Sequence, residues 1–336
     1  MRALATIVVI LALTATAATA QQVADSAFHY AGPEPAYEAG TGPRVCVDAA
    51  HHNFHTVDGR YLAFGTLLRD DGYRVHANTD PFAPSSLGEC DVLVISNATA
   101  EANAEDRAYP HGSAFTRAEI TALLDWVLGG GSLLLIVDHA PWPGANGDLG
   151  VLLGAHMLDG YVGMEVFGDL DEDALSGAAE LYGVPIDRLL ESFGEPGRLA
   201  EHAILRGRSS AEAISTVTTF TGHAFYPSSQ MEPLLVLSPD AWGGAPLNLN
   251  LPEAPQEAMP TFPVGGWLQG GAVRVGEGRA VVLGEAAMCT AQLAGPQRVP
   301  MGMNNPAAPQ NAQFCLNVVH WLSGLLDERT QQEDFR

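Results

Sequence analysis

Lysine is absent from this chain of 336 residues, and all 16 positions counted as lysine or arginine hold arginine. Schiff-base enzymes, pyridoxal-phosphate enzymes and Walker-type phosphate loops each need a lysine amine, so the sequence excludes these classes. Aspartate and glutamate together number 39, which gives a formal net charge of −23. This excess of negative charge disfavours binding to nucleic acid and to anionic membranes.

Several motifs are missing as well. There is no G-x-S-x-G segment, so a serine-hydrolase elbow is not indicated. The glycines around Glu277 lie between two predicted strands instead of opening a helix, and a nucleotide cofactor is therefore not expected. No C-x-x-C pair occurs, which argues against a structural zinc ribbon. Four cysteines allow three disulfide pairings, and the sequence leaves open whether they form disulfides or buried thiols: Cys46, Cys90, Cys289 and Cys315.

The first residues have the pattern of a secretory signal peptide. Arg2 precedes an apolar run, and small residues follow it up to Ala20. The run is too short to span a bilayer, so we expect no membrane insertion after cleavage. The sequence therefore predicts a signal peptide over 1–20 and an exported protein, either periplasmic or secreted.

The rest of the chain alternates apolar runs with helical periodicity. We expect an N-terminal extension over 21–43, one α/β domain over 44–327 and a polar tail over 328–336. Near-continuous apolar strands separated by helices are typical of a parallel sheet that is buried on both faces. The first strand is expected near the middle of that sheet. The clearest predicted elements are strands at 44–48, 73–77, 91–97 and 132–137 and helices at 60–71 and 115–128. Thr116 and Glu119 are predicted to form a capping box at the start of the second helix, and the glycines at 129–131 are predicted to end it.

Past Pro141 the pattern is weaker. The PWPGANGDLG segment is predicted to be a loop, and a short helix is expected to begin over 149–153. Residues 156–212 carry many charges and glycines without a clear strand, which predicts a helical or irregular insertion or cap. The Pro-rich stretch over 246–263 is predicted to be a long loop. Further strands are expected at 214–220 and 234–237, a hairpin at 272–275 and 279–283, and a final helix at 310–326.

Polar residues follow the predicted strands at the points where the strands end. In open α/β sheets, ligands bind just past the carboxyl ends of the strands, so residues remote in sequence can converge there. We expect catalytic roles for Asp48, Asp138 and Glu285, as acids, bases or activators of water. The three histidines predicted to hold a divalent metal such as zinc are His51, His55 and His139. The residues predicted to bind substrate are Asn53, Asn97, His223, Gln292 and Asn304.

Each of these side chains also has a structural interpretation. Asp48 could cap the turn that follows its strand, and Asn53 could satisfy turn backbone. Glu285 lies between small residues in a tight turn, where a carboxylate is either a general base, a ligand or a buried anchor. The spacing of His51 and His55 places both on one face only if the segment is helical.

Four segments carry a resemblance: VCVDAAHHNFHTVDGRY, GGSLLLIVDHAP, GRAVVLGEAAM and MGMNNPAAPQNAQFCLNVVHWL. Together they resemble an exported group within the class I glutamine-amidotransferase-like superfamily, over about 44–326. The resemblance implies a flavodoxin-like three-layer α/β sandwich with a mainly parallel central sheet, related to ThuA-like domains. Amidotransferases of this superfamily carry a cysteine after a central strand. This chain has Asp138 and His139 there, so glutaminase chemistry does not transfer with the fold.

Three hypotheses for the function follow. The first is an exported hydrolase of a sugar or other small polar compound, in which a metal lowers the pKa of bound water. The second is a non-catalytic module that uses the same sheet edge to bind a carbohydrate or a protein partner. The third is a thiol-dependent amidotransferase-like enzyme that uses Cys289. The sequence leaves the oligomeric state open.

Overall fold

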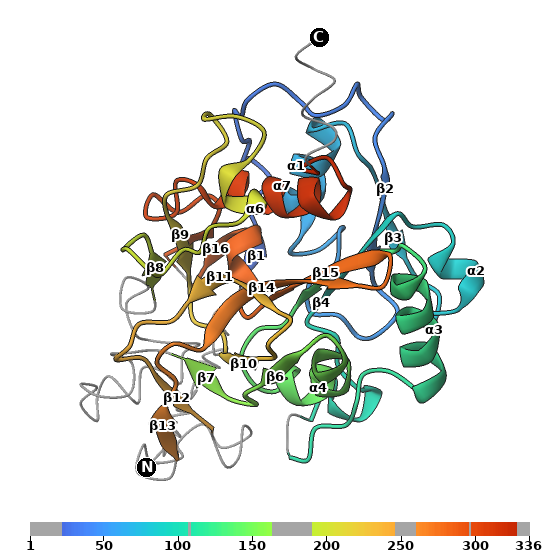
Figure 1. Cartoon of the computed structure of the whole chain (residues 1–336), viewed down its shortest axis with the longest axis vertical. Helices are drawn as coiled ribbons and strands as arrows, with labels where there is room; N and C mark the ends of the chain where they lie inside the picture. Colours follow the sequence, from blue (N-terminus) through green and yellow to red (C-terminus); the bar gives the residue numbers. More distant parts are fainter. Residues whose placement is uncertain (1–21, 107–108, 163–189, 246–259, 296, 328–336) are drawn as a thin grey trace, which may run out of the picture.

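A central sheet of nine strands organises the residues that the computed structural model describes (Figure 1). Those residues are 22–106, 109–162, 190–245, 260–295 and 297–327. The strands of the central sheet are β2 (Arg44–Asp48), β3 (Arg74–Asn78), β4 (Val92–Ser96), β5 (Ser132–Ile136), β6 (Ala155–Met157), β10 (Phe225–Pro227), β11 (Glu232–Val236), β14 (Leu268–Val275) and β15 (Gly278–Leu283).

The strand order is β3-β2-β4-β5-β15-β14-β10-β6, and β11 pairs with β14. The pairs from β3 to β15 are all parallel, whereas those that involve β14, β10, β11 and β6 are antiparallel. The predicted hairpin is therefore confirmed as β14 and β15. The first strand of the sheet, β2, lies second from one edge, so the prediction that it lies near the middle was wrong. The central position is taken by β15, which comes from the C-terminal part of the chain.

Helices cover both faces of the parallel strands. The helices are α1 (Leu62–Asp70), α2 (Pro84–Leu87), α3 (Arg117–Leu128), α4 (Trp142–Leu152), α6 (Ala203–Arg206) and α7 (Asn311–Leu322), with short 3-10 turns η1 (Glu101–Asn103) and η4 (Ala287–Cys289).

Successive residues of the parallel strands alternate between two cores. Val45 and Val47 pack in the core that contains α1 and α7, whereas Cys46 between them packs in the core of α3 and α4. This alternation follows from the two-residue period of a strand, and it makes the sheet the middle of three layers. Figure 1 shows α1 and α7 on one side of the sheet and α3 and α4 on the other. The fold class predicted from the sequence, a mainly parallel three-layer α/β sandwich, is confirmed.

Outside the central sheet, three small antiparallel sheets are described. They are β1-β16-β17, β13-β12-β7 and β8-β9. Their strands are β1 (Val23–Ala24), β7 (Tyr161–Val162), β8 (Glu191–Phe193), β9 (Val217–Thr219), β12 (Trp242–Gly244), β13 (Thr261–Pro263), β16 (Ala291–Ala294) and β17 (Val299–Gly302).

Two segments differ from the sequence-based expectation. The described part of 156–212 contains the strands β6, β7 and β8 and the short helix α6, and β6 joins the central sheet, whereas the sequence showed no clear strand there. That this region is a helical or irregular insertion or cap stays a prediction. The PWPGANGDLG segment, expected as a loop, lies in α4, because Pro143 is accommodated in the first helical turn, where a missing N–H costs nothing. The predicted signal peptide, the predicted polar tail, residues 163–189 and most of the predicted loop over 246–263 lie outside the described residues.

The N-terminus of α3 has the predicted capping box. The Thr116 hydroxyl accepts from the Glu119 N–H at 3.3 Å, and the Thr116 N–H donates to Glu119 Oε2 at 2.9 Å. The helix ends before Gly129, as predicted. In the part of the chain that the structure describes, no helix has the length and apolar character needed to cross a membrane.

Replacing Thr116 with alanine is expected to lower the free energy of unfolding by about 1 kcal/mol, because it removes the side-chain acceptor for one otherwise unsatisfied helical N–H. Urea unfolding of the wild type and the variant measures this difference. Thr121→Ala is the control, since its exposed hydroxyl bonds only to the Arg117 carbonyl within the helix. Equal losses in the two variants would contradict a capping role.

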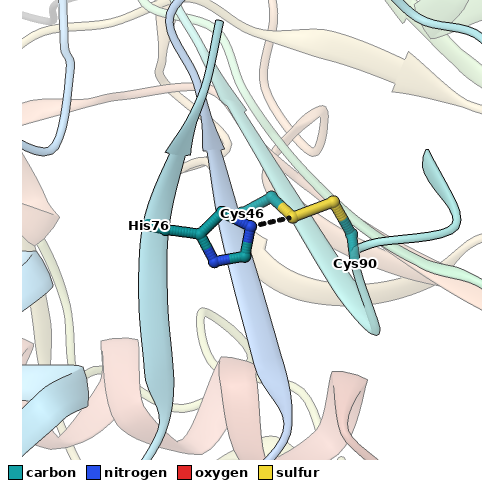
Figure 2. A group of neighbouring side chains, drawn as sticks. All are labelled: Cys46, His76 and Cys90. Atoms are coloured by element: carbon teal, nitrogen blue, oxygen red, sulfur yellow. Dashed lines mark hydrogen bonds between the residues drawn. A yellow bond between two sulfur atoms is a disulfide. The ribbon is translucent and has the colours of Figure 1, made fainter. Parts of the chain in front are cut away.

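All four cysteines form disulfides. Cys46 bonds to Cys90, and Cys289 bonds to Cys315. The first links β2 to the segment before β4, as Figure 2 shows, and the second ties η4 to α7. The sequence alone does not distinguish disulfides from free thiols, and the structure shows disulfides. The thiol-dependent hypothesis loses its nucleophile, because Cys289 is not a free thiol.

The Cys289→Ser/Cys315→Ser double variant is expected to lower the free energy of unfolding by roughly 3 kcal/mol. Loss of a bridge across this loop gives the unfolded chain more conformational freedom. Chemical denaturation without reductant measures the effect. A double variant as stable as the wild type would show that the bridge adds no constraint beyond the packing of α7.

Candidate functional site

The carboxyl ends of β2, β4, β5 and β15 lie at one edge of the sheet. Their parallel register pairs Ser96 with Ile136 and Ile136 with Leu283, so the residues just past these pairs leave the sheet together. We call this edge the rim and define it by Asp48, Asn97, Asp138 and Glu285. The sequence predicted that these residues converge, and hydrogen bonds and electrostatic contacts join them or their immediate neighbours, as described below.

At the β2 end of the rim, His51 lies between two carboxylates. Its Nδ1 is 2.8 Å from Asp48 Oδ2, and its Nε2 is 2.9 Å from Glu119 Oε1. All three side chains are buried, and the imidazole packs against the rings of Phe82 and Phe115. With both nitrogens donating, the ring is held as an imidazolium between the end of β2 and the start of α3.

The electrostatics of this group agree with its geometry. Burial lowers the pKa of His51, but hydrogen bonding and charge attraction from Asp48 and then Glu119 outweigh burial and raise the pKa above 6.5. Burial likewise opposes the charged form of Glu119, yet hydrogen bonds from His51 and Thr116 lower its pKa to about 2. The three groups form a buried ion network that also joins the capping box of α3.

His55 lies in a different environment. Its Nδ1 is 3.2 Å from Asn97 Nδ2, and its ring packs against those of Phe54 and Tyr61. Complete burial, and to a lesser extent the charge of Arg60, lowers the pKa of His55 to about 3. The ring is therefore neutral at physiological pH, and the Asn97 amide donates to it.

Asn97 connects His55 to the next strand end. Its Oδ1 accepts from the Asp138 N–H at 2.8 Å, while its Nδ2 faces His55. Asn97 has a φ of 47°, in the left-handed region where asparagine is better tolerated than most residues. With this backbone conformation, the Asn97 side-chain amide contacts both Asp138 and His55. Asn53, also predicted to bind substrate, accepts from the His51 N–H and donates to the Ser96 carbonyl, so it orders the same turn.

Asp138 and Glu285 follow the carboxyl ends of the neighbouring strands β5 and β15 at equivalent positions. Each lies two residues past the registered pair of Ile136 and Leu283. Glu285 accepts from the Ala287 N–H at 2.6 Å and the Met288 N–H at 2.7 Å, which holds the η4 turn. Asp138 accepts from the His139 N–H at 2.8 Å. Asp138 is 8% exposed and Glu285 only 1%, so both residues are buried and Asp138 is the less buried of the two.

Both carboxyls of this pair have raised pKa values. For Glu285, burial is the main cause, and repulsion from the Asp138 charge adds to it, so the pKa lies well above 4.5. Burial also raises the pKa of Asp138, against the opposing effects of His139 and of backbone N–H groups. Two nearby buried carboxyls do not both ionise readily, so the pair holds a proton in the range where isolated carboxyls have lost it.

Two histidines flank the carboxyl pair. His139 lies stacked on Tyr161 with ring centroids 4.3 Å apart, and its Nδ1 is 2.8 Å from the Ala140 carbonyl. His223 is fully buried with Nδ1 3.0 Å from the Val137 carbonyl, and burial lowers its pKa to about 4. The His223 ring is therefore neutral, with the proton on Nδ1. Its Nε2 is a buried acceptor without a hydrogen-bond partner among the described residues.

Gln292 and Asn304 form a separate group beside β16. Asn304 donates to Asp25 and to the Gln292 carbonyl, both at 3.0 Å, and Gln292 donates to Thr290 at 2.9 Å. These bonds tie the segment around β1 to the β16-β17 hairpin. Their predicted role in substrate binding stays a prediction, since the hydrogen bonds described for them go to Asp25, Thr290 and Gln292 and not to the rim carboxyls.

The three histidines predicted as metal ligands do not form a ligand set. Among the described residues, the group of three whose ligand atoms lie within 4.8 Å of one another is Cys46, His76 and Cys90, and not His51, His55 and His139. Both nitrogens of His51 already face carboxylates. These histidines do not fit a zinc ion without rearrangement, and we derive no step through a metal. Metal binding at the rim stays a prediction that metal analysis of purified protein can test.

Two residues that contact neighbours of the rim were not selected from the sequence. Glu119 was predicted only as part of a capping box, but its other oxygen contacts His51. Tyr61 is fully buried, packs on His55 and donates to the Ala286 carbonyl at 3.1 Å. The capping-box pattern could have indicated Glu119, because a buried capping glutamate has a second carboxylate oxygen that needs a hydrogen-bond partner. No pattern pointed to Tyr61.

Comparison with known proteins gives a likeness of fold. No family model matches the chain, and no curated protein matches it significantly. Among solved structures, the mmIFT52 N-terminal domain is similar with a TM-score of 0.53 and 13% identity, covering 83% of this chain and 97% of that one. A ThuA-like protein from Bacteroides uniformis gives a TM-score of 0.42 and 12% identity, covering 85% and 94%. A protein described as part of a GMP synthase from Thermoplasma acidophilum gives 0.38 and 8%, covering 87% and 98%.

The sheet and the first of these comparisons define a class of fold. The chain is a mixed α/β protein with a large, mostly parallel central sheet, and its fold is similar to that of the mmIFT52 N-terminal domain. At identities this low the likeness concerns the fold alone. The function therefore has to be argued from the side chains at the rim.

Proposed function

We propose that this protein is a hydrolase of a sugar or other small polar compound that uses the Asp138 and Glu285 pair for acid–base chemistry. The observation that carries the proposal is the placement of these two carboxyls past the ends of adjacent parallel strands. This is the position where open α/β sheets bind ligands. Pairs of carboxyls whose surroundings alter their pKa values are typical of enzymes that move protons.

The two carboxyls have different roles in this proposal. Glu285 is the more buried, its oxygens are held by backbone N–H groups, and it carries the shared proton. Asp138 is then the ionised partner and acts as general base toward a water molecule. A raised pKa makes Asp138 a stronger base than an ordinary aspartate. Asn97 and the His139 N–H fix the orientation of Asp138. The neutral His223 bonds through Nδ1 to the carbonyl of Val137, the residue before Asp138, and its Nε2 remains an acceptor.

A panel of p-nitrophenyl glycosides and p-nitrophenyl acetate tests this function by release of nitrophenolate. We expect turnover by the wild type that is lost in Asp138→Asn and kept in Asp148→Asn, which changes an exposed aspartate of α4. Turnover that survives in Asp138→Asn would exclude Asp138 as the base.

A second function, a non-catalytic module for a carbohydrate or partner, is favoured by one observation. Many polar atoms at and next to the rim are already bonded within the protein, including both oxygens of Glu285 and both nitrogens of the neighbouring His51. Calorimetry with oligosaccharides distinguishes the two functions. Binding without turnover of any glycoside or ester would support the module and contradict the hydrolase.

We propose that the chain is exported. The two disulfides support this, because such bonds form and persist in oxidising compartments. Expression of the full chain with recovery of the exported fraction tests it. We expect a mature N-terminus at Gln21, and exported material that still begins at Met1 would contradict cleavage.

A further inference from the structure

The Cys46–Cys90 disulfide lies beside a histidine on the edge of the sheet. Cys46 on β2 and His76 on β3 are direct neighbours in the parallel register. Their side chains lie on the same face, with His76 Nε2 3.2 Å from Cys46 Sγ. Figure 2 shows the imidazole directed at this sulfur, with Cys90 on its far side. His76 is exposed while both cysteines are buried.

We propose that reduction of this disulfide creates a metal site for a soft or borderline cation such as Zn²⁺, with Cys46, Cys90 and His76 as its ligands. The ligand atoms of the three residues already lie within 4.8 Å of one another. Two thiolates and one imidazole are ligands that Zn²⁺ favours. This site lies on the opposite side of β2 from the core of α1 and α7, away from the carboxyl pair at the rim.

The geometry needs only a small change. Zinc bonds of about 2.3 Å to sulfur and about 2.0–2.1 Å to nitrogen place the ligands of a tetrahedral site nearly 4 Å apart. After reduction, the two sulfurs therefore have to separate by about 2 Å. The Cα atoms of the two cysteines, 5.6 Å apart, can stay in place while the Cβ–Sγ bonds rotate. His76 and Cys46 are fixed by the register of two paired strands.

The fourth position of the site would face solvent. β3 is an edge strand of the central sheet, and His76 is exposed on it. Three protein ligands with one open position are the pattern of zinc sites that hold a water or an exogenous ligand. A cation can therefore enter from the sheet edge without passing through the core.

The redox step balances with a dithiol as the reductant. A thiolate of the dithiol attacks one sulfur of the disulfide, and its second thiol resolves the mixed disulfide. The Cys46–Cys90 bond breaks with gain of two electrons and two protons, and the reductant becomes a disulfide. Binding of Zn²⁺ then displaces the two thiol protons, and the neutral His76 imidazole donates a lone pair.

Cobalt is the probe for the test, since Co²⁺ bound tetrahedrally by thiolates has charge-transfer and d–d absorption that free Co²⁺ lacks. The full chain is reduced with dithiothreitol, freed of the reductant under argon and titrated with Co²⁺, followed by competition with Zn²⁺. We expect one Co²⁺ per reduced chain with thiolate absorption, displaced by Zn²⁺, and none in the oxidised chain. Circular dichroism of the reduced chain records whether the fold persists.

Three variants identify the ligands. Cys46→Ser/Cys90→Ser is expected to abolish the absorption, and Cys289→Ser/Cys315→Ser is expected to keep it. His76→Ala should weaken Co²⁺ binding by at least roughly tenfold, because it removes a direct ligand. Loss of a residue that only hydrogen-bonds to a ligand already costs about 10–100-fold in metal affinity. The proposal is overturned if the reduced chain gives no thiolate absorption, folded or not. It is equally overturned if His76→Ala binds Co²⁺ as tightly as the wild type.

Discussion

Replacing His51 with alanine is expected to lower the free energy of unfolding by about 3–5 kcal/mol, because it leaves buried carboxylates without their counter-charge. Asp48 is fully buried and Glu119 nearly so, and each faces one nitrogen of the His51 ring. Chemical denaturation near pH 6 measures the loss. His52→Ala is the matched control, since that neighbouring side chain is exposed and its change should cost little.

The network can be tested further by removing one carboxylate from the variant. Adding Glu119→Gln to His51→Ala should restore part of the lost stability, because a neutral amide costs less to bury than an unpaired carboxylate. In the wild type, Glu119→Gln should instead be destabilising. If the two changes simply add, His51 and Glu119 are not coupled as the structure indicates.

The loss in His51→Ala should also depend on pH. The pKa of His51 is raised above 6.5 in the folded state, so its stabilising effect is complete below pH 6.5 and is lost as the pH rises through the folded-state value. The pKa of Glu119 is lowered from 4.5 to about 2, so its effect is complete above pH 4.5 and is lost as the pH falls toward 2. The difference between wild type and variant should therefore be largest between pH 4.5 and 6.5.

Replacing Asp138 with asparagine is expected to reduce turnover by roughly 10²–10⁴-fold, the usual effect of removing a general base. The amide has the same shape and can still accept from the His139 N–H, so the fold should persist. In the wild type, turnover should fall as the pH drops through the raised pKa of Asp138, since the base must be ionised. Initial rates against pH, with circular dichroism of the variant, measure both effects.

Infrared spectroscopy tests the same carboxyl pair without a substrate. We expect a protonated carboxylic acid band that persists in the wild type above the pH at which an isolated glutamic acid has ionised, and that disappears in Glu285→Gln. In Asp138→Asn the band should titrate at a lower pH, because the repulsion that helps to raise the pKa of Glu285 is gone. A wild-type band that titrates like that of an isolated carboxylic acid would contradict the shared proton.

The sequence predicted most of the parallel half of the fold. Strands such as Ser132–Ile136 are apolar on both faces, and the capping box at Thr116 fixed the start of α3, so local patterns were sufficient there. The position of β15 between β5 and β14 was not predictable from such patterns, because it depends on pairing between distant segments. The strands β6 and β7 are short and carry no clear alternation, which explains why they were missed.

For the site, the sequence identified which strand ends carry chemistry but not how the side chains pair. The sequence correctly placed four polar residues at the carboxyl ends of neighbouring parallel strands: Asp48, Asn97, Asp138 and Glu285. The role of His51 could not be read from its spacing to His55, because its partner Glu119 comes from a helix 68 residues further along the chain. Hydrogen-bond partners of this kind depend on helix packing, which one sequence does not encode in any local pattern.

The position of β15 has a consequence for the order of folding during synthesis. The strands β2 to β5 are complete by residue 136, yet their neighbour in the sheet begins at residue 278. Until that hairpin is made, the growing chain exposes the unpaired edge of β5, an apolar strand that could pair with other chains. Contacts this distant in sequence also slow folding. Chaperone binding to the nascent chain should therefore be strongest over this interval, and truncation before residue 278 should produce aggregates instead of a smaller folded domain.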